Sequence, residues 1–148
     1  MTVQRVSMIT LGVADLDAAR GFYERWGWQV RQATPQIVFF QMGTLVLGLF
    51  PLPALAEDQG RADAVATLGM GGVTLAQNYA TEHEVDERFQ AAIAAGATHL
   101  KAPTAAPWGG YSGYFADPDG HVWELAVNPY WELGDDGATH IPEDLPAQ

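Results

Sequence analysis

The chain has 148 residues and no cysteine, which suits a single domain with a sizeable core and excludes disulfides and thiol chemistry. Its formal net charge is −11, with seven basic against eighteen acidic residues. This balance argues against nucleic-acid binding, because nucleic-acid backbones need clustered Lys and Arg, and it is compatible with a cationic ligand. The sequence shows no signal-peptide pattern and no apolar stretch of membrane length. We therefore expect a cytoplasmic protein that does not bind a membrane.

The first fifty residues predict a β-α-β-β-β unit. The apolar run 6–13 is of strand length, and Asp15 can cap a helix that ends at Gly27. Three more strands are expected after this helix, at 28–31, 36–42 and 45–50.

The same order of elements returns in the second half of the chain. Residues 51–71 are predicted to be a connector with a short helical turn at 54–59, and a strand follows at 73–78. The Thr81-x-x-Glu84 pattern is a capping box that begins a helix ending at Gly96. Later strands are expected at 99–102, 111–116 and 122–127, with a loop at 103–110.

A repeat in the amino-acid sequence itself supports this duplication. Residues 8–12, Met-Ile-Thr-Leu-Gly, match residues 72–76, Gly-Val-Thr-Leu-Ala, at an offset of 64. Neither small sheet would be well buried alone. We predict an α+β fold in which two βαβββ modules form a curved mixed sheet around a central cavity, where ligands usually bind. The predicted boundaries within this single domain are a first module over about 5–50, the connector 51–71, a second module over about 72–128 and a C-terminal tail at 129–148.

The run 114–127 predicts a β-hairpin. Its turn, Asp-Pro-Asp-Gly, combines a proline that presets φ, two side chains that can bond to turn amides, and a glycine that accepts positive φ. Alternation along the following strand places Glu124 between Val122 and Ala126 on one face. Because an unpaired buried carboxylate is costly, Glu124 either lies at a concave site or is bonded to a metal or a donor. The alternative is that it belongs to a solvated strand face or is an edge residue without a role.

Together these features resemble the vicinal oxygen chelate superfamily. It includes glyoxalase I, extradiol dioxygenases, fosfomycin-resistance transferases and bleomycin-binding resistance proteins. The resemblance covers roughly residues 5–128 and lies in both modules. The stretches that carry it are 9–16, 21–24 and 114–125, of which the Asp-Pro-Asp-Gly-His turn followed by Val-Trp-Glu-Leu is the most specific.

The resemblance implies a position for a metal but not the residues to hold it. Metal-dependent members bind a divalent ion through a histidine on the first strand of each module and a glutamate on the last strand. The matching positions are Met8, Gly72 and Glu124. A thioether is a poor ligand for a hard ion, glycine has no side chain, and a catalytic metal needs about three protein ligands. We therefore expect no metal residues and no cofactor, unless a divalent metal uses a non-standard site.

The histidines do not rebuild such a site. None has metal-ligand spacing to another, and we interpret all four as surface or turn residues: His83, His99, His121 and His140.

The candidate site that remains is aromatic and hydroxylic. In the fosfomycin-resistance members, the positions matching Ser112 and Tyr114 face the cavity and touch substrate, and alternation places these two on one face. The other candidate ligand-binding residues are Met8, Thr10, Thr74, Trp108 and Tyr111. The last two belong to a glycine-rich run whose aromatic rings can stack on a flat ligand or a cation, and they can equally pack under the loop or across a dimer contact.

Three classes of function fit these residues. The preferred one is a metal-free protein that binds or sequesters a cationic or aromatic small molecule, and the bleomycin-resistance resemblance then implies a homodimer. The second is a lyase, isomerase or dioxygenase-type enzyme that uses Glu124 as acid or base, with or without a divalent metal, while Tyr114 donates to a developing oxyanion. The third is an interaction module whose cavity is filled by side chains such as Met8 and Phe39. Whether the protein is an enzyme stays open at this point.

Overall fold

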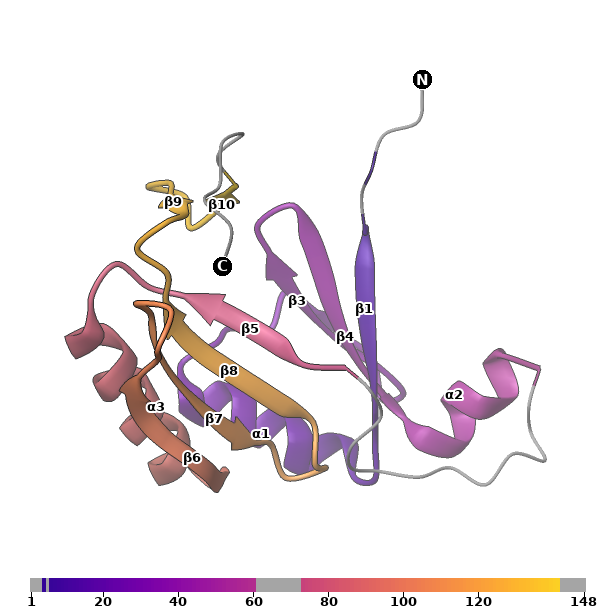
Figure 1. Cartoon of the computed structure of the whole chain (residues 1–148). Helices are drawn as coiled ribbons and strands as arrows, with labels where there is room; N and C mark the ends of the chain where they lie inside the picture. Colours follow the sequence, from indigo (N-terminus) through magenta and orange to yellow (C-terminus); the bar gives the residue numbers. More distant parts are fainter. Residues whose placement is uncertain (1–3, 5, 61–72, 142–148) are drawn as a thin grey trace. The chain divides into compact units, whose positions relative to one another are not determined.

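The computed structural model describes residues 4, 6–60 and 73–141 (Figure 1). The chain divides into two compact units, Met1–Gly69 and Met70–Gln148, and each is considered by itself. Among the described residues, no helix has the length and apolar character needed to cross a membrane.

The first unit is a four-stranded mixed sheet with two helices. Its strand order is β1-β4-β3-β2, with β1 parallel to β4 and the other pairs antiparallel. Its elements are β1 (Met8–Val13), α1 (Leu16–Trp26), β2 (Gln32–Ala33), β3 (Val38–Met42), β4 (Leu45–Pro51) and α2 (Leu52–Asp58). The sequence-predicted caps of α1 are confirmed, since Asp15 accepts from the Ala18 amide at 3.0 Å and Gly27 has a φ of 118°.

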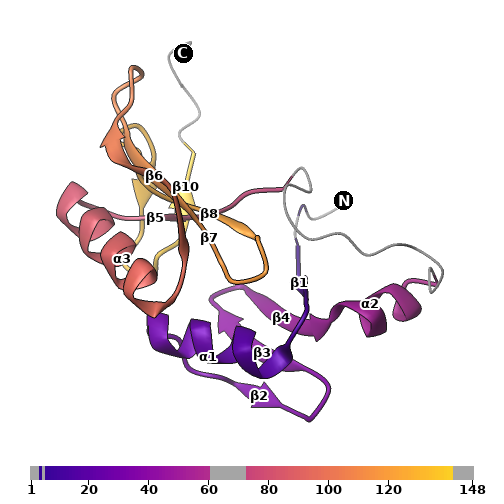
Figure 2. The same cartoon turned by 90° about the horizontal axis from the view of Figure 1, so that it is seen from below.

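The second unit repeats this arrangement. Its sheet has the order β5-β8-β7-β6, with β5 parallel to β8, and α3 packs against β6, β7 and β8 (Figure 2). Its elements are β5 (Leu75–Asn78), α3 (Glu82–Ala95), β6 (Thr98–Ala105), β7 (Tyr111–Ala116), β8 (Val122–Val127), β9 (Glu132–Leu133) and β10 (Thr139–His140). The last two form a separate antiparallel pair.

The strand registers show that the two units are copies of one module. Leu11 on β1 pairs with Leu49 on β4, and Leu75 on β5 pairs with Trp123 on β8. Leu11 and Leu75 are related by the same offset of 64 as the letter repeat. The predicted α+β class with two βαβββ modules is confirmed, and the cavity between the modules stays a prediction.

The strand predicted at 28–31 is wrong, because β2 begins at Gln32. The Trp28 ring stacks on Tyr23 of α1, with centroids 4.9 Å apart and planes 16° apart. This contact draws the start of the segment onto the aromatic core of the first unit. The Arg31 amide donates to the Phe39 carbonyl at 2.8 Å, which extends the ladder by one residue before β2.

The loop predicted at 103–110 is also partly wrong, because β6 continues to Ala105. β6 shifts register twice against β7. Gly113 of β7 lets β6 approach there, since a Cβ at this position would lie 2.8 Å from the backbone nitrogen of Pro103. Sequence alternation does not reveal such an irregular strand.

The hairpin between β7 and β8 forms as predicted. Asp117 is buried, and its Oδ1 accepts from the amides of Asp119 and His121, both at 2.9 Å. Gly120 takes the positive φ, 90°. This turn fixes the register that places Tyr114 opposite Glu124.

We predict that Asp117→Ala lowers the free energy of unfolding by about 2 kcal/mol, because one buried and one partly buried amide lose a carboxylate acceptor. Urea denaturation followed by circular dichroism measures it. The matched control is Asp136→Ala, which removes one 3.0 Å bond to the Ala138 amide in an exposed turn and should change stability by less than about 0.5 kcal/mol. Equal losses in the two variants would contradict this account of the turn.

Candidate functional site

The retained glutamate is engaged by a tyrosine on the neighbouring strand. The Tyr114 hydroxyl donates to Glu124 Oε2 at 2.8 Å, and both side chains are half-buried. Their strand neighbours Phe115 and Trp123 are buried, so alternation puts the Tyr114–Glu124 pair on the sheet face opposite α3. Of the alternatives open from sequence, the structure thus gives Glu124 a hydrogen-bond donor.

More polar side chains share this face of the second sheet. Ser112 lies two residues before Tyr114 on β7, and Lys101 of β6 is in register with Tyr114. Thr74 is exposed and lies just before β5. The structure therefore brings together three sequence-predicted residues, Ser112, Tyr114 and Glu124.

Tyr111 is not part of this group. Its hydroxyl donates to Asp86 Oδ1 of α3 at 2.6 Å, which places the ring on the helix side of the sheet. This hydrogen bond to a carboxylate raises the pKa of Tyr111 to about 12. Tyr111 therefore points away from Ser112 and Tyr114.

Trp108 covers the backbone of its own loop. A Cβ on Gly110 would lie 2.0 Å from Trp108 Cη2, so the ring sits directly over that glycine. The side chain is still 37% exposed. Because Gly110 has no Cβ, the Trp108 ring can take this position, where it stays partly exposed.

The first sheet presents a second group of predicted residues. Met8 pairs with Val46, and Thr10 pairs with Gly48, on the same face of β1 and β4. The Phe39 ring covers Gly48, where a Cβ would lie 3.3 Å from Phe39 Cε1. A pocket of about 340 Å³ opens on this sheet, lined by Met8, Arg31, Gln32, Phe39, Phe40, Gln41 and Val46.

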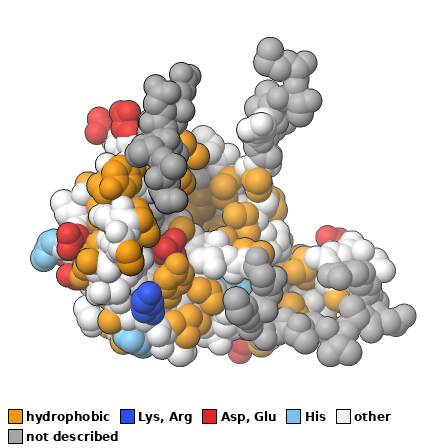
Figure 3. Space-filling view, in the orientation of Figure 1, with side chains coloured by type: hydrophobic (Ala, Val, Ile, Leu, Met, Phe, Trp, Pro, Cys, Tyr) orange, Lys and Arg blue, Asp and Glu red, His pale blue; other side chains and the backbone are white. Residues whose placement is uncertain are grey.

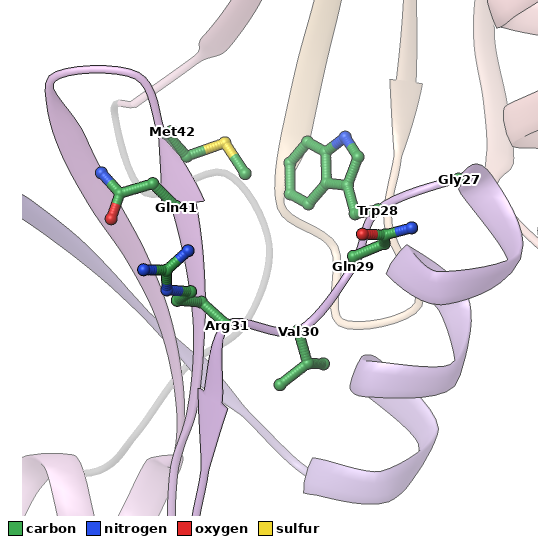
Figure 4. A pocket seen from close by; sticks show the side chains of 7 residues that line it. All are labelled: Gly27, Trp28, Gln29, Val30, Arg31, Gln41 and Met42. Atoms are coloured by element: carbon green, nitrogen blue, oxygen red, sulfur yellow. The ribbon is translucent and has the colours of Figure 1, made fainter.

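Sequence reasoning missed a larger pocket in the same unit. It has a volume of about 600 Å³ and is lined by Gly27, Trp28, Gln29, Val30, Arg31, Gln41 and Met42 (Figure 4). The misplaced strand at 28–31 concealed it, because that prediction assigned Trp28 and Arg31 to a regular sheet. The signal in the sequence was the helix-ending Gly27 followed at once by a tryptophan.

The face of the molecule that Figure 3 shows has few basic groups. In the view of Figure 3, hydrophobic side chains are prominent and blue side chains are scarce, in line with the net charge of −11. Among the described residues, Arg20 is paired with Glu24 at 3.1 Å, whereas no hydrogen bond or ion pair is made by the side chains of Arg31 and Lys101.

The residues at the family's metal positions do not fit a hard divalent ion. Met8 offers a thioether, Glu124 offers one carboxylate that already accepts from Tyr114, and Gly72 lies outside the described residues. Within 6–60 and 73–141, no group of three or more His, Cys, Asp or Glu side chains is placed to hold a metal.

Comparison with known proteins agrees with the sequence resemblance. The family model for the Glyoxalase/Bleomycin resistance protein/Dioxygenase superfamily matches residues 5–125. None of the curated proteins compared with the chain matches it.

Solved structures give the same result. A glyoxalase-related enzyme from Fulvimarina pelagi is 42% identical over 94% of this chain and 99% of that one, with a TM-score of 0.87. A lactoylglutathione lyase from Agrobacterium tumefaciens is 28% identical over 86% of this chain and 96% of that one, with a TM-score of 0.65. A glyoxalase/bleomycin resistance protein/dioxygenase family enzyme from Burkholderia phytofirmans PsJN is 26% identical over 82% of this chain and 96% of that one, with a TM-score of 0.74.

The pKa values of Tyr114 and Tyr111, each of which donates a hydrogen bond to a carboxylate, give a test of the site geometry. The hydrogen bond to Glu124, helped by burial, raises the pKa of Tyr114. Because the folded phenol binds its proton more tightly, the stabilisation is present below about pH 10 and is lost as the pH rises through the raised pKa.

We predict that Glu124→Gln lowers the pKa of Tyr114 and leaves the pKa of Tyr111 at about 12, because Asp86 is untouched. Asp86→Asn should do the reverse. NMR titration of the tyrosine Cζ signals, assigned with Tyr→Phe variants, measures both values. An unchanged pKa of Tyr114 in Glu124→Gln would show that the bond is not formed in solution.

Proposed function

Since the chain belongs to the Glyoxalase/Bleomycin resistance protein/Dioxygenase superfamily, we propose that it binds and sequesters a small organic molecule without a complete metal triad. The observation that carries this proposal is the 2.8 Å hydrogen bond from Tyr114 to Glu124. It gives the one retained ligand residue a partner of its own, and Met8 and Gly72 supply no hard donor in its place.

The pockets of the first unit suit such a ligand. Met8, Phe39 and Val46 give an apolar wall, while glutamine side chains add hydrogen-bonding groups at the rim. Volumes of about 340 and 600 Å³ are in the usual range for small-molecule sites. Apolar walls with a few polar groups favour a ligand with a flat, ring-containing body. The homodimer and the cytoplasmic location expected from the sequence stay predictions.

The same hydrogen bond supports a second candidate, an acid–base enzyme. Glu124 can take a proton from a substrate carbon, the electron pair then moves onto the adjacent carbonyl oxygen, and Tyr114 donates a hydrogen bond to that oxygen. The structural relatives that are described as a glyoxalase-related enzyme and a lactoylglutathione lyase add weight to this class.

We predict that EDTA-treated wild-type protein shows no thermal shift with Zn²⁺, Ni²⁺, Mn²⁺ or Mg²⁺. The matched variant Met8→His/Gly72→His restores histidines at the two positions where metal-dependent members of the family carry them, and keeps Glu124. At a metal concentration of 100 times Kd it should gain about 5–10 °C in Tm. Differential scanning fluorimetry measures both. A saturable metal-dependent rise in the wild-type Tm would contradict the metal-free proposal.

We further predict that an aromatic compound selected by thermal shift is recovered unchanged, by mass spectrometry, after incubation with the protein. Conversion of the compound would favour the enzyme candidate. In that case Glu124→Gln should reduce the rate about 10²- to 10⁴-fold, because the acid–base group is lost. Asp86→Asn makes the same charge change on the opposite face of the sheet and should leave both binding and rate unaltered.

A further inference from the structure

Arg31 stands between the two pockets of the first unit. It contributes to the wall of the 600 Å³ pocket and to that of the 340 Å³ pocket. Its side chain is exposed and makes no hydrogen bond or ion pair with the described part of the chain. This planar charged group borders two pockets whose lining residues include no Asp or Glu, so it is available for a ligand.

The larger pocket offers aromatic and thioether surfaces beside this charge. One face of the Trp28 indole is stacked on Tyr23, with centroids 4.9 Å apart, and the ring is held further by Phe40 at 5.4 Å. Figure 4 shows the Met42 side chain pointing toward the indole, while Val30 points away. A ring preorganised in this way can stack on a flat ligand at low entropic cost, and methionine sulfur adapts to aromatic edges.

Arg31 is the one charged residue among those that line the two pockets. The residues that line the two pockets include no Asp or Glu, and their other polar members are glutamines. The net charge of −11 is therefore carried elsewhere, and the cationic ligand suggested by composition finds no carboxylate here. An anionic group finds Arg31, whose planar guanidinium matches a carboxylate in two parallel hydrogen bonds.

We propose that the ligand is a flat aromatic monoanion, with its anionic group on Arg31 and its ring in the pocket of Trp28 and Met42. This inference rests on the proposed small-molecule binding and specifies its ligand class. Gln41 borders both pockets and has its amide nitrogen held by the Gly43 carbonyl at 2.9 Å. This hydrogen bond orients the Gln41 side chain.

A charge series on one ring system tests the proposal. The probes are 2-naphthoate, 2-naphthamide and 2-naphthylmethylammonium, titrated into the full-length protein by isothermal calorimetry. Naphthoate should bind about tenfold more tightly than the neutral amide, through a charge-assisted contact. The ammonium should bind most weakly, and the naphthoate affinity should fall as NaCl is raised.

Three variants locate the contact. Arg31→Gln should remove the preference for naphthoate while retaining the amide affinity, whereas Arg20→Gln, on α1 and outside both pockets, should retain the preference. Met42→Ala should weaken the binding of naphthoate and of naphthamide by the same factor, because this substitution changes only the contact with the ring. Circular dichroism confirms that each variant is folded.

The possible results separate this inference from the proposed function. Equal binding of naphthoate and naphthamide, or a preference that survives Arg31→Gln, would overturn the anionic ligand class and leave small-molecule binding intact. Tightest binding of the ammonium would overturn it in favour of the cationic expectation. If none of the three probes binds, the aromatic site itself is refuted, and proposed ligand binding then depends on the outcome of the thermal-shift selection.

Discussion

The second unit depends on the turn that joins β7 to β8. Asp117 holds the two amides of that turn, and the register it sets extends to Tyr114 opposite Glu124. A shift of one residue would move Glu124 to the helix face, away from Tyr114. The hydrogen bond that carries the proposed function is therefore a consequence of turn chemistry several residues away.

The first unit depends instead on aromatic packing at the end of α1. The left-handed Gly27 ends the helix, and Trp28 then packs on Tyr23, which keeps residues 28–30 out of the sheet. The cost is a shorter β2, and the result is an open pocket beside Arg31. The two copies of the module thus offer different chemistry: a hydrogen-bonded carboxylate in one, and in the other a guanidinium that borders two pockets whose lining residues include no Asp or Glu.

Local patterns in the sequence determined the repeat, the helix caps and the hairpin. The helix caps depend on contacts within a few residues, so the local sequence is enough to specify them. These caps are Asp15 and Gly27 for α1 and Thr81 and Gly96 for α3. The family resemblance follows from the same local signals in both modules. The pairing of Ser112, Tyr114 and Glu124 on one face was also predictable, because alternation along two hairpin strands requires no knowledge of distant residues.

Only the tertiary structure decided the rest. In the folded chain Tyr111 donates to Asp86, the Trp108 ring lies over Gly110, and Glu124 accepts from the Tyr114 hydroxyl. The tertiary structure also joined Arg31 and Met42, which are separated along the chain, around one pocket. These outcomes depend on packing between elements and on an irregular segment after α1. A periodic pattern indicates which face of its own strand a side chain occupies. It does not indicate which residues from distant parts of the chain pack against that face.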